Sequence, residues 1–294
     1  MRVNPNPIND VLFSLNLNQE RAQTALQQIS TGKRVNQPSD DPSAAALYTI
    51  NVASEARIDQ YLKSVGSVQS SFQTADSALA SVVTALNQAI TLGTEAANGT
   101  YSTDNMQQII PGVQAVLSQV VQLANTSVQG SYIFAGTATT TTPFVLNNGV
   151  VTYNGNSGVN NAEIADGTTV QTNVPGDQIF QNSSGDVMGS LQQLITALQN
   201  GDKTAIGNAT TSLGNALQEL NVQRSFYGNA LNQLTNDQAA LNQENLNLKT
   251  QDNTLVGVDM AKAATDLSQA QVGYQASLAA SAKVLQPTLL DYLK

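Results

Sequence analysis

The sequence predicts a mainly α-helical protein made of long antiparallel coiled-coil rods with a small β-rich inserted domain. One indication is composition: 41% of residues are hydrophobic but only 5% are aromatic, so much of the apolar content is alanine, which suits close helix packing. Another is a strict seven-residue apolar repeat along 203–255, whose 3.5-residue period requires a partner helix wrapped around it. Its members are Ile206, Leu213, Leu220, Tyr227, Leu234, Leu241, Leu248 and Leu255.

The partner of this helix is expected within the same chain. A helix over 203–255 would be about 80 Å long and cannot bury its stripe alone. The segment from Ser43 to Asn98 has a similar length and its own heptad repeat, so an antiparallel pair is the economical arrangement. The seam residues expected on this second rod are Ile58, Val65, Phe72, Leu79 and Leu86.

The two ends of the chain carry shorter heptad repeats. The first repeat stops at Gly32, and the second starts in a new phase after Gly257. Helices of this length are marginal alone in water, so we expect them to pair inside one subunit and to offer their other apolar faces to neighbouring subunits. The expected assembly residues are Ile8, Leu12, Leu15, Ala22, Leu26, Ile29, Met260, Leu267, Tyr274, Leu278 and Leu285.

A connector, GKRVNQPSDDP, covers residues 32–42. Gly32 suits a helix C-terminus, and Asp41 followed by Pro42 suits the start of the next helix. Lys33 and Arg34 either pair with Asp40 and Asp41 of a neighbour or stay in a solvated loop. A cation site at the two aspartates is disfavoured, because no further acids lie at ligand spacing.

The middle of the chain changes pattern. A third helix is expected over 104–128, where Pro111 predicts a kink or a late start. Asn147-Asn148-Gly149 between apolar runs predicts a hairpin. Asp186 is expected to open a short helix that ends near Asn200, Asp202 to cap the long rod, and Arg224 to pair with Glu219 or an acid opposite.

These patterns predict a nested domain organisation. Residues 1–42 and 257–294 form a terminal coiled-coil assembly domain, 43–137 and 186–256 form the long-helix rod domain, and 138–185 form the β-rich insertion.

Composition argues against several function classes. Cysteine and histidine are both absent, which removes disulfides, thiolate nucleophiles, the usual zinc sites and imidazole chemistry. There is no glycine-rich phosphate loop, and the acid pair Glu163 and Asp166 lacks a basic partner. A net charge of −9 disfavours nucleic acid, and no segment reaches the roughly 20 apolar residues of a membrane span. We therefore expect a protein without catalytic, cofactor or metal sites, with no cleaved signal peptide.

Both ends resemble the flagellin-like family of bacterial flagellar axial proteins. ALQQISTGKRVNQPSDDPSAAALY (25–48) is similar to its N-terminal signature, and LVGVDMAKAATDLSQAQVGYQASLAASAKVLQPTLLDYL (255–293) to its C-terminal one. The SDDP connector, GSYIFAGT (130–137) and the VDMA…LLDYL ending resemble the hook-associated protein 3 branch more than flagellin. Pro287 and the Pro111-Gly112 pair depart from the family pattern.

The resemblance implies a structural adaptor that joins hook-side and filament-side lattices at the hook–filament junction. It implies self-association in a ring or helical layer, with hook-associated protein 1 on the hook side and flagellin on the filament side. It also implies an export chaperone at the C-terminal region and secretion through the flagellar type III apparatus. A flagellin-type filament subunit, or a type III secreted coiled-coil effector or adhesin, are the alternatives. Unaided growth into long filaments would indicate the first.

Overall fold

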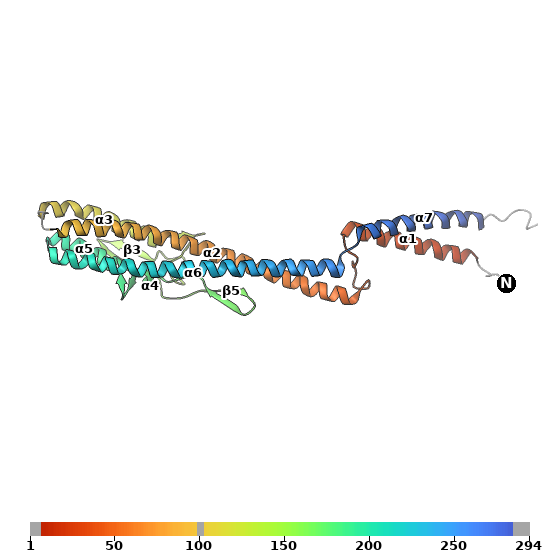
Figure 1. The fold of residues 1–294 in the computed structure, drawn as a ribbon, viewed down its shortest axis with the longest axis horizontal. Helices are drawn as coiled ribbons and strands as arrows, with labels where there is room; N and C mark the ends of the chain where they lie inside the picture. The colour runs from red at the N-terminus through yellow and green to blue at the C-terminus, as the bar shows by residue number, and fades with distance from the viewer. Residues whose placement is uncertain (1–6, 99–102, 285–294) are drawn as a thin grey trace, which may run out of the picture. The chain divides into compact units, whose positions relative to one another are not determined.

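The computed structural model describes residues 7–98 and 103–284, which are mainly helical (Figure 1). The helices are α1 (Pro7–Thr31), α2 (Pro42–Ala97), α3 (Thr103–Ala124), α4 (Gly176–Phe180), α5 (Val187–Asn200), α6 (Lys203–Val256) and α7 (Met260–Val284). The strands are β1 (Ser127–Val128), β2 (Ser131–Tyr132), β3 (Phe144–Asn147), β4 (Val150–Tyr153), β5 (Asn161–Ala165), β6 (Thr168–Gln171), β7 (Gln181–Asn182) and β8 (Gly185–Asp186). The predicted fold class is confirmed.

The chain divides into two compact units. One contains residues 1–57 with 243–294, and the other contains residues 58–242. Both boundaries fall inside the long helices α2 and α6, whereas the sequence placed domain boundaries at 42 and 257. The domain division drawn from the heptad phase therefore stays a prediction.

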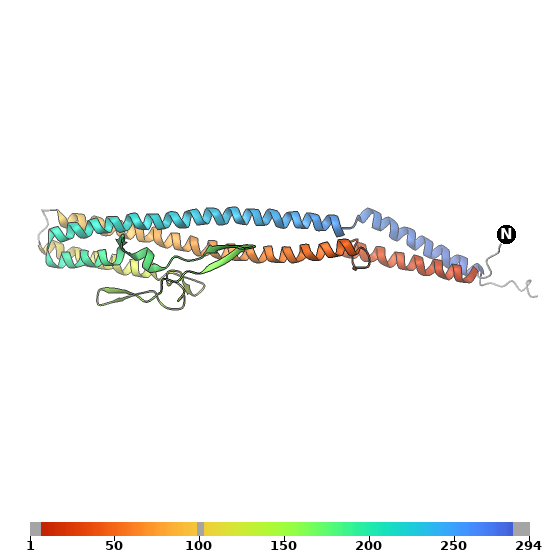
Figure 2. The ribbon, with the colours of Figure 1, turned by 90° about the horizontal axis from the view of Figure 1, so that it is seen from below.

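In the unit of residues 58–242, α2 and α6 run antiparallel. The Phe72 ring meets the Tyr227 ring edge-on at 5.2 Å, and Asp76 is ion-paired with Arg224. Further along α2, Gly93 lies against Thr210 of α6. Residues later in α2 thus contact residues earlier in α6, as in an antiparallel pair. Near this end α3 packs on α5, and the four helices lie side by side (Figures 1 and 2).

Helix α3 continues through Pro111. It begins at Thr103, so the expectation of a late start is wrong. Met106, Ile110 and Val113 are all buried on either side of the proline, while Pro111 itself is exposed. Burial of these apolar side chains offsets the lost backbone hydrogen bond.

The β-rich segment consists of separate two-stranded antiparallel hairpins. The β3–β4 hairpin turns at Asn148 and Gly149, whose φ angles are 51° and 82°, as the predicted hairpin requires. Phe180 contacts both Phe134 and Phe144 edge-on, each at 5.3 Å between ring centres. This aromatic cluster is the core of a segment otherwise rich in threonine, asparagine and glycine.

In the unit of residues 1–57 and 243–294, α1 and α7 form an antiparallel pair. Asn18 Nδ2 donates to Ser277 Oγ at 3.3 Å, and the Val258 amide donates to the Gly32 carbonyl. In the same unit, the start of α2 packs along the end of α6, where Asn51 Nδ2 donates to Asp252 Oδ1 at 2.7 Å.

Candidate assembly surfaces

The seam between α1 and α7 is built from small residues. Ala25, Ala263 and Ala270 are buried to 4% exposure or less. Five predicted assembly residues are half-buried in the same helix pair: Leu15, Ala22, Ile29, Leu267 and Tyr274. The alanine row was missed from the sequence, because alanines every seven residues in an alanine-rich chain give little contrast.

The same helix pair leaves large apolar side chains exposed. Leu12, Leu26, Met260 and Leu278, all predicted assembly residues, are between 45% and 58% exposed. Two that the heptad search did not select are exposed further: Phe13 at 70% and Val272 at 63%. Ile8 is in α1 but its side chain is outside the described residues, as is all of Leu285. The assignment of these residues to an intersubunit interface stays a prediction.

A cleft lies on one side of this pair. Its volume is about 570 Å³, and Leu26, Leu267 and Tyr274 form its apolar part. The rest of its lining is Ala22 and four glutamines: Gln19, Gln23, Gln271 and Gln275. An apolar floor with neutral hydrogen-bonding edges can take a further helix without introducing fixed charges.

The two segments in which the heptad repeat is interrupted, near Gly32 and near Gly257, contact each other. Lys33 and Gly257 form an antiparallel β-bridge, and the Arg34 amide donates to the Val256 carbonyl at 2.7 Å. The side chain of Val35 packs against Ala44 and Val256 in a small apolar cluster. The sequence indicated that the repeats are interrupted at Gly32 and Gly257, but it did not indicate that the two segments pair.

The Arg34 side chain is bonded within its own subunit. Its guanidinium donates to Asp41 Oδ2 at 3.2 Å and to the Leu255 carbonyl at 2.9 Å. Asp41 also accepts from the Ala44 amide at the start of α2, and this bond and Arg34 hold the pKa of Asp41 below its usual range. In this subunit Arg34 thus pairs with an aspartate of its own connector, and a pairing of Lys33 or Arg34 with a neighbour's aspartate stays a prediction.

The rod seam is apolar and closed within the chain. Eleven of its thirteen predicted residues are 6% exposed or less, and Leu248 and Leu255 are half-buried. The buried members are Ile58, Val65, Phe72, Leu79, Leu86, Ile206, Leu213, Leu220, Tyr227, Leu234 and Leu241. Such a seam has nothing left to offer a neighbour.

Polar residues interrupt the seam at a few points. Arg224 Nε donates to Asp76 Oδ1 at 2.9 Å and Nη2 to Oδ2 at 3.4 Å, so the partner of Arg224 is the acid opposite and not Glu219. Asn51 and Asp252 are 7% and 8% exposed and bond each other. Buried polar pairs of this kind favour one register of two helices over its alternatives.

The acid pair Glu163 and Asp166 anchors the β5–β6 hairpin. Tyr61 Oη of α2 lies 2.8 Å from Asp166 Oδ1 and 3.3 Å from Glu163 Oε1. The hydrogen bond to Asp166 and the negative charge of both acids raise the pKa of Tyr61 to about 12. This acid pair thus holds the β5–β6 hairpin on α2.

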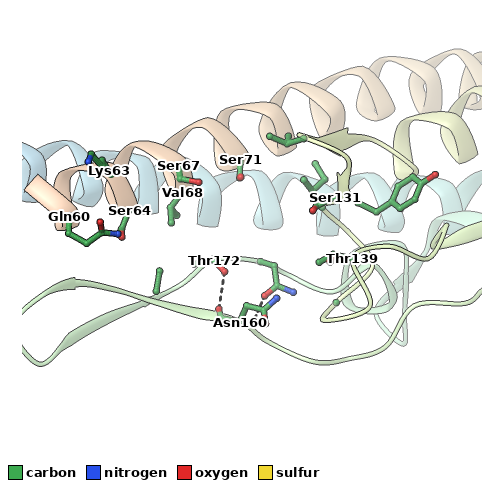
Figure 3. Close-up of a pocket in the computed structure, with 16 residues that line it drawn as sticks. Gln60, Lys63, Ser64, Ser67, Val68, Ser71, Ser131, Thr139, Asn160 and Thr172 are labelled. Atoms are coloured by element: carbon green, nitrogen blue, oxygen red, sulfur yellow. Dashed lines mark hydrogen bonds between the residues drawn. The ribbon is translucent and has the colours of Figure 1, made fainter.

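A polar cleft of about 450 Å³ lies between α2 and this hairpin (Figure 3). Ser64, Ser67 and Ser71 of α2 face Asn160 and Thr172 across it. Lys63 gives the lining its cation, and no acid lines it.

Among the described residues no group of three or more acids could hold a metal ion. No helix in that part of the chain is long and apolar enough to cross a membrane.

Comparison with known families matches both ends of the chain. A model of the bacterial flagellin N-terminal helical region matches residues 6–139. A model of the bacterial flagellin C-terminal helical region matches residues 210–293.

Curated relatives align over most of their length. Flagellar hook-associated protein 3 of Escherichia coli is 28% identical over 85% of this chain and 86% of the relative. The protein of that name from Salmonella typhimurium is 29% identical over the same shares. A flagellin of Listeria innocua is 22% identical over 100% of this chain and 99% of its own.

Solved structures show the same fold. FlgL of Bacillus cereus aligns with a TM-score of 0.60 and 26% identity over 69% of this chain and 99% of that one. A structure described as a putative flagellar hook-associated protein from Vibrio parahaemolyticus aligns with a TM-score of 0.69 and 18% identity, over 74% and 100%. The flagellar junction protein FlgL of Legionella pneumophila aligns at 0.60 and 16%, over 72% and 100%.

Proposed function

The chain belongs to the bacterial flagellin family, in its hook-associated protein 3 branch, and we propose that it joins hook-side and filament-side lattices as a structural adaptor. The observation that carries this choice is the 28–29% identity to hook-associated protein 3 over 85% of the chain, against 22% for the flagellin of Listeria innocua. Its place is the flagellum, outside the cell.

The division of labour between the helices supports the adaptor role. The rod seam is closed within the subunit, so the rods hold their shape without neighbours. The α1–α7 pair keeps Leu12, Phe13, Leu26 and Val272 exposed, and exposed apolar side chains gathered on one helix pair are typical of protein contacts. These residues dock against other copies in a ring or helical layer, with hook-associated protein 1 on one side and flagellin on the other.

Before assembly the exposed apolar side chains of α7 require a partner that shields them from solvent. Met260, Val272 and Leu278 of α7 are 45–63% exposed, which supports the proposal that a cytoplasmic export chaperone binds this helix. The route out of the cell is the flagellar type III apparatus. Binding of the chaperone to a chain truncated after residue 257 would contradict this assignment.

Electron microscopy of cells that lack the gene tests the function. The expected result is intact hooks without filaments and flagellin shed into the medium, with filaments restored by a plasmid-borne copy. Normal filaments in the deletion strain would overturn the proposal. If the purified chain grows alone into long filaments, the chain is a flagellin-type subunit instead.

A further inference from the structure

We propose that a cleft beside the connector, here called the Lys33 socket, receives a carboxylate side chain from a second copy of this chain. The proposal rests on the self-association proposed above and names a specific contact within it. The socket has a volume of about 540 Å³. It lies between the connector and the start of α2, and the lining residues that carry the argument are Lys33 and Tyr48.

Lys33 and Tyr48 form a pair of hydrogen-bond donors. Lys33 Nζ donates to Tyr48 Oη at 2.6 Å and lies 4.4 Å from the centre of the tyrosine ring. An ammonium group carries three N–H donors, so two remain for a partner. Because the Tyr48 oxygen accepts from Lys33, its own proton is available to donate. A carboxylate is the protein group that accepts from a cation and a hydroxyl together.

The described part of the subunit supplies no such carboxylate. None of the residues that line the socket is acidic. Asp41 is paired with Arg34, and Asp40 accepts from the backbone amides of Asn36 and Gln37. In the described residues, 7–98 and 103–284, Lys33 has no salt bridge. Its half-buried ammonium therefore gains most from an acid that arrives from outside.

The surroundings fit a protein better than a free anion. Val35, Pro38, Ala45 and Val256 line the same cleft as Lys33 and Tyr48. Apolar side chains around a polar donor pair are typical of the centre of a protein contact.

A second copy offers the matching charge. The chain has 21 acidic residues against 12 basic ones. Glu20 of α1, Glu244 of α6 and Asp266 of α7 are exposed, and within the described part of the chain they make no hydrogen bond or ion pair. Each is available to a neighbour's socket.

Carbodiimide cross-linking tests the contact, because it joins an amine to a carboxylate only where the two touch. Equal amounts of full-length chain with normal and with ¹⁵N nitrogen are mixed and added to isolated hooks that lack the junction layer. The hooks are then cross-linked, and the joined peptides are identified by mass spectrometry. The expected result is a Lys33 cross-link to an acidic peptide, with mixed isotopes in about half of the pairs. Lys33 cross-links with unmixed isotopes, or none at Lys33, would overturn the proposal.

Variants separate the socket from a structural role. Lys33→Gln should raise the chain concentration needed to saturate hook tips about tenfold, since it removes a charge-assisted hydrogen bond. Lys33→Arg should preserve attachment, and Lys249→Gln, at an exposed lysine of α6, should leave it unchanged. All three chains should melt within a few degrees of the parent. If the parent chain fails to attach to hooks at all, the proposed function fails; attachment unaffected by Lys33→Gln refutes the socket alone.

Discussion

The rod seam and the α1–α7 seam are both heptad seams, yet they bury very different side chains. The rod seam closes over Phe72, Leu79, Leu220 and Leu234, each at 0–1% exposure. The α1–α7 seam closes over alanines and leaves Phe13 and Leu26 in solvent. At about 25 cal/mol per Å² of buried apolar surface, large residues stabilise a helix pair far more than alanines do. The rod seam therefore stabilises the subunit by itself, and we propose that neighbours complete the α1–α7 seam.

The largest loss of stability is expected when a charge is placed in the rod seam. Leu234→Asp puts a carboxylate at a position with 0% exposure. We expect a loss of about 3–5 kcal/mol in the free energy of unfolding, enough to unfold most of the chain. Circular dichroism with thermal melting measures this. A cooperative melt close to that of the parent would show that the seam is not continuous at Leu234.

The matched change in the other seam should spare the fold and remove assembly. Leu267 is half-buried on α7, so a carboxylate there keeps access to water. Leu267→Asp should leave the melting temperature of the rods nearly unchanged. It should also abolish filament formation when the variant is supplied to a strain that lacks the gene. Melting as severe as that of Leu234→Asp would place the terminal helices in the subunit's own core.

The buried polar pair Asn51 and Asp252 interrupts the apolar contact between α2 and α6. Asn51→Leu leaves Asp252 buried at 8% exposure without its 2.7 Å partner. We expect a loss of about 2–3 kcal/mol, and recovery of most of it in the double variant Asn51→Leu/Asp252→Leu, since two apolar residues leave no orphan charge. Urea unfolding of the single and double variants measures both. A double variant weaker than Asn51→Leu would mean that the pair contributes more than register.

The smallest effect is expected at the hairpin anchor. The pKa of Tyr61 is raised to about 12 from an ordinary 10 by its two acids, so the folded state holds its proton more tightly than the unfolded state. Its contribution to stability is complete below pH 10 and disappears as the pH rises to 12. Tyr61→Phe should remove that part of the pH dependence. The readout is hydrogen exchange of the β5–β6 amides between about pH 10 and 12. Equal profiles for both chains would refute the anchor.

Much of the rod could be predicted, because leucine every seven residues stands out in any sequence. The same rule failed for Ala25, Ala263 and Ala270, since alanine is common throughout this chain. The helical path through Pro111 was also beyond a local rule, because packing of Ile110 and Val113 decides it. Pairings between distant residues, such as Lys33 with Gly257 and Tyr61 with Asp166, have no local signature. They become visible only once the fold brings the segments together.

The contact between Asn18 and Ser277 spans 259 positions of the chain, almost its full length. At a synthesis rate of 5–20 residues per second, α1 emerges roughly 10–50 s before α7 is complete. During that interval the first helix has no native partner, whereas each rod helix finds its own sooner. The pairing of the two ends is therefore the last event in the folding of a subunit. It requires that α7 has been made, so a chain that stops before α7 cannot form it.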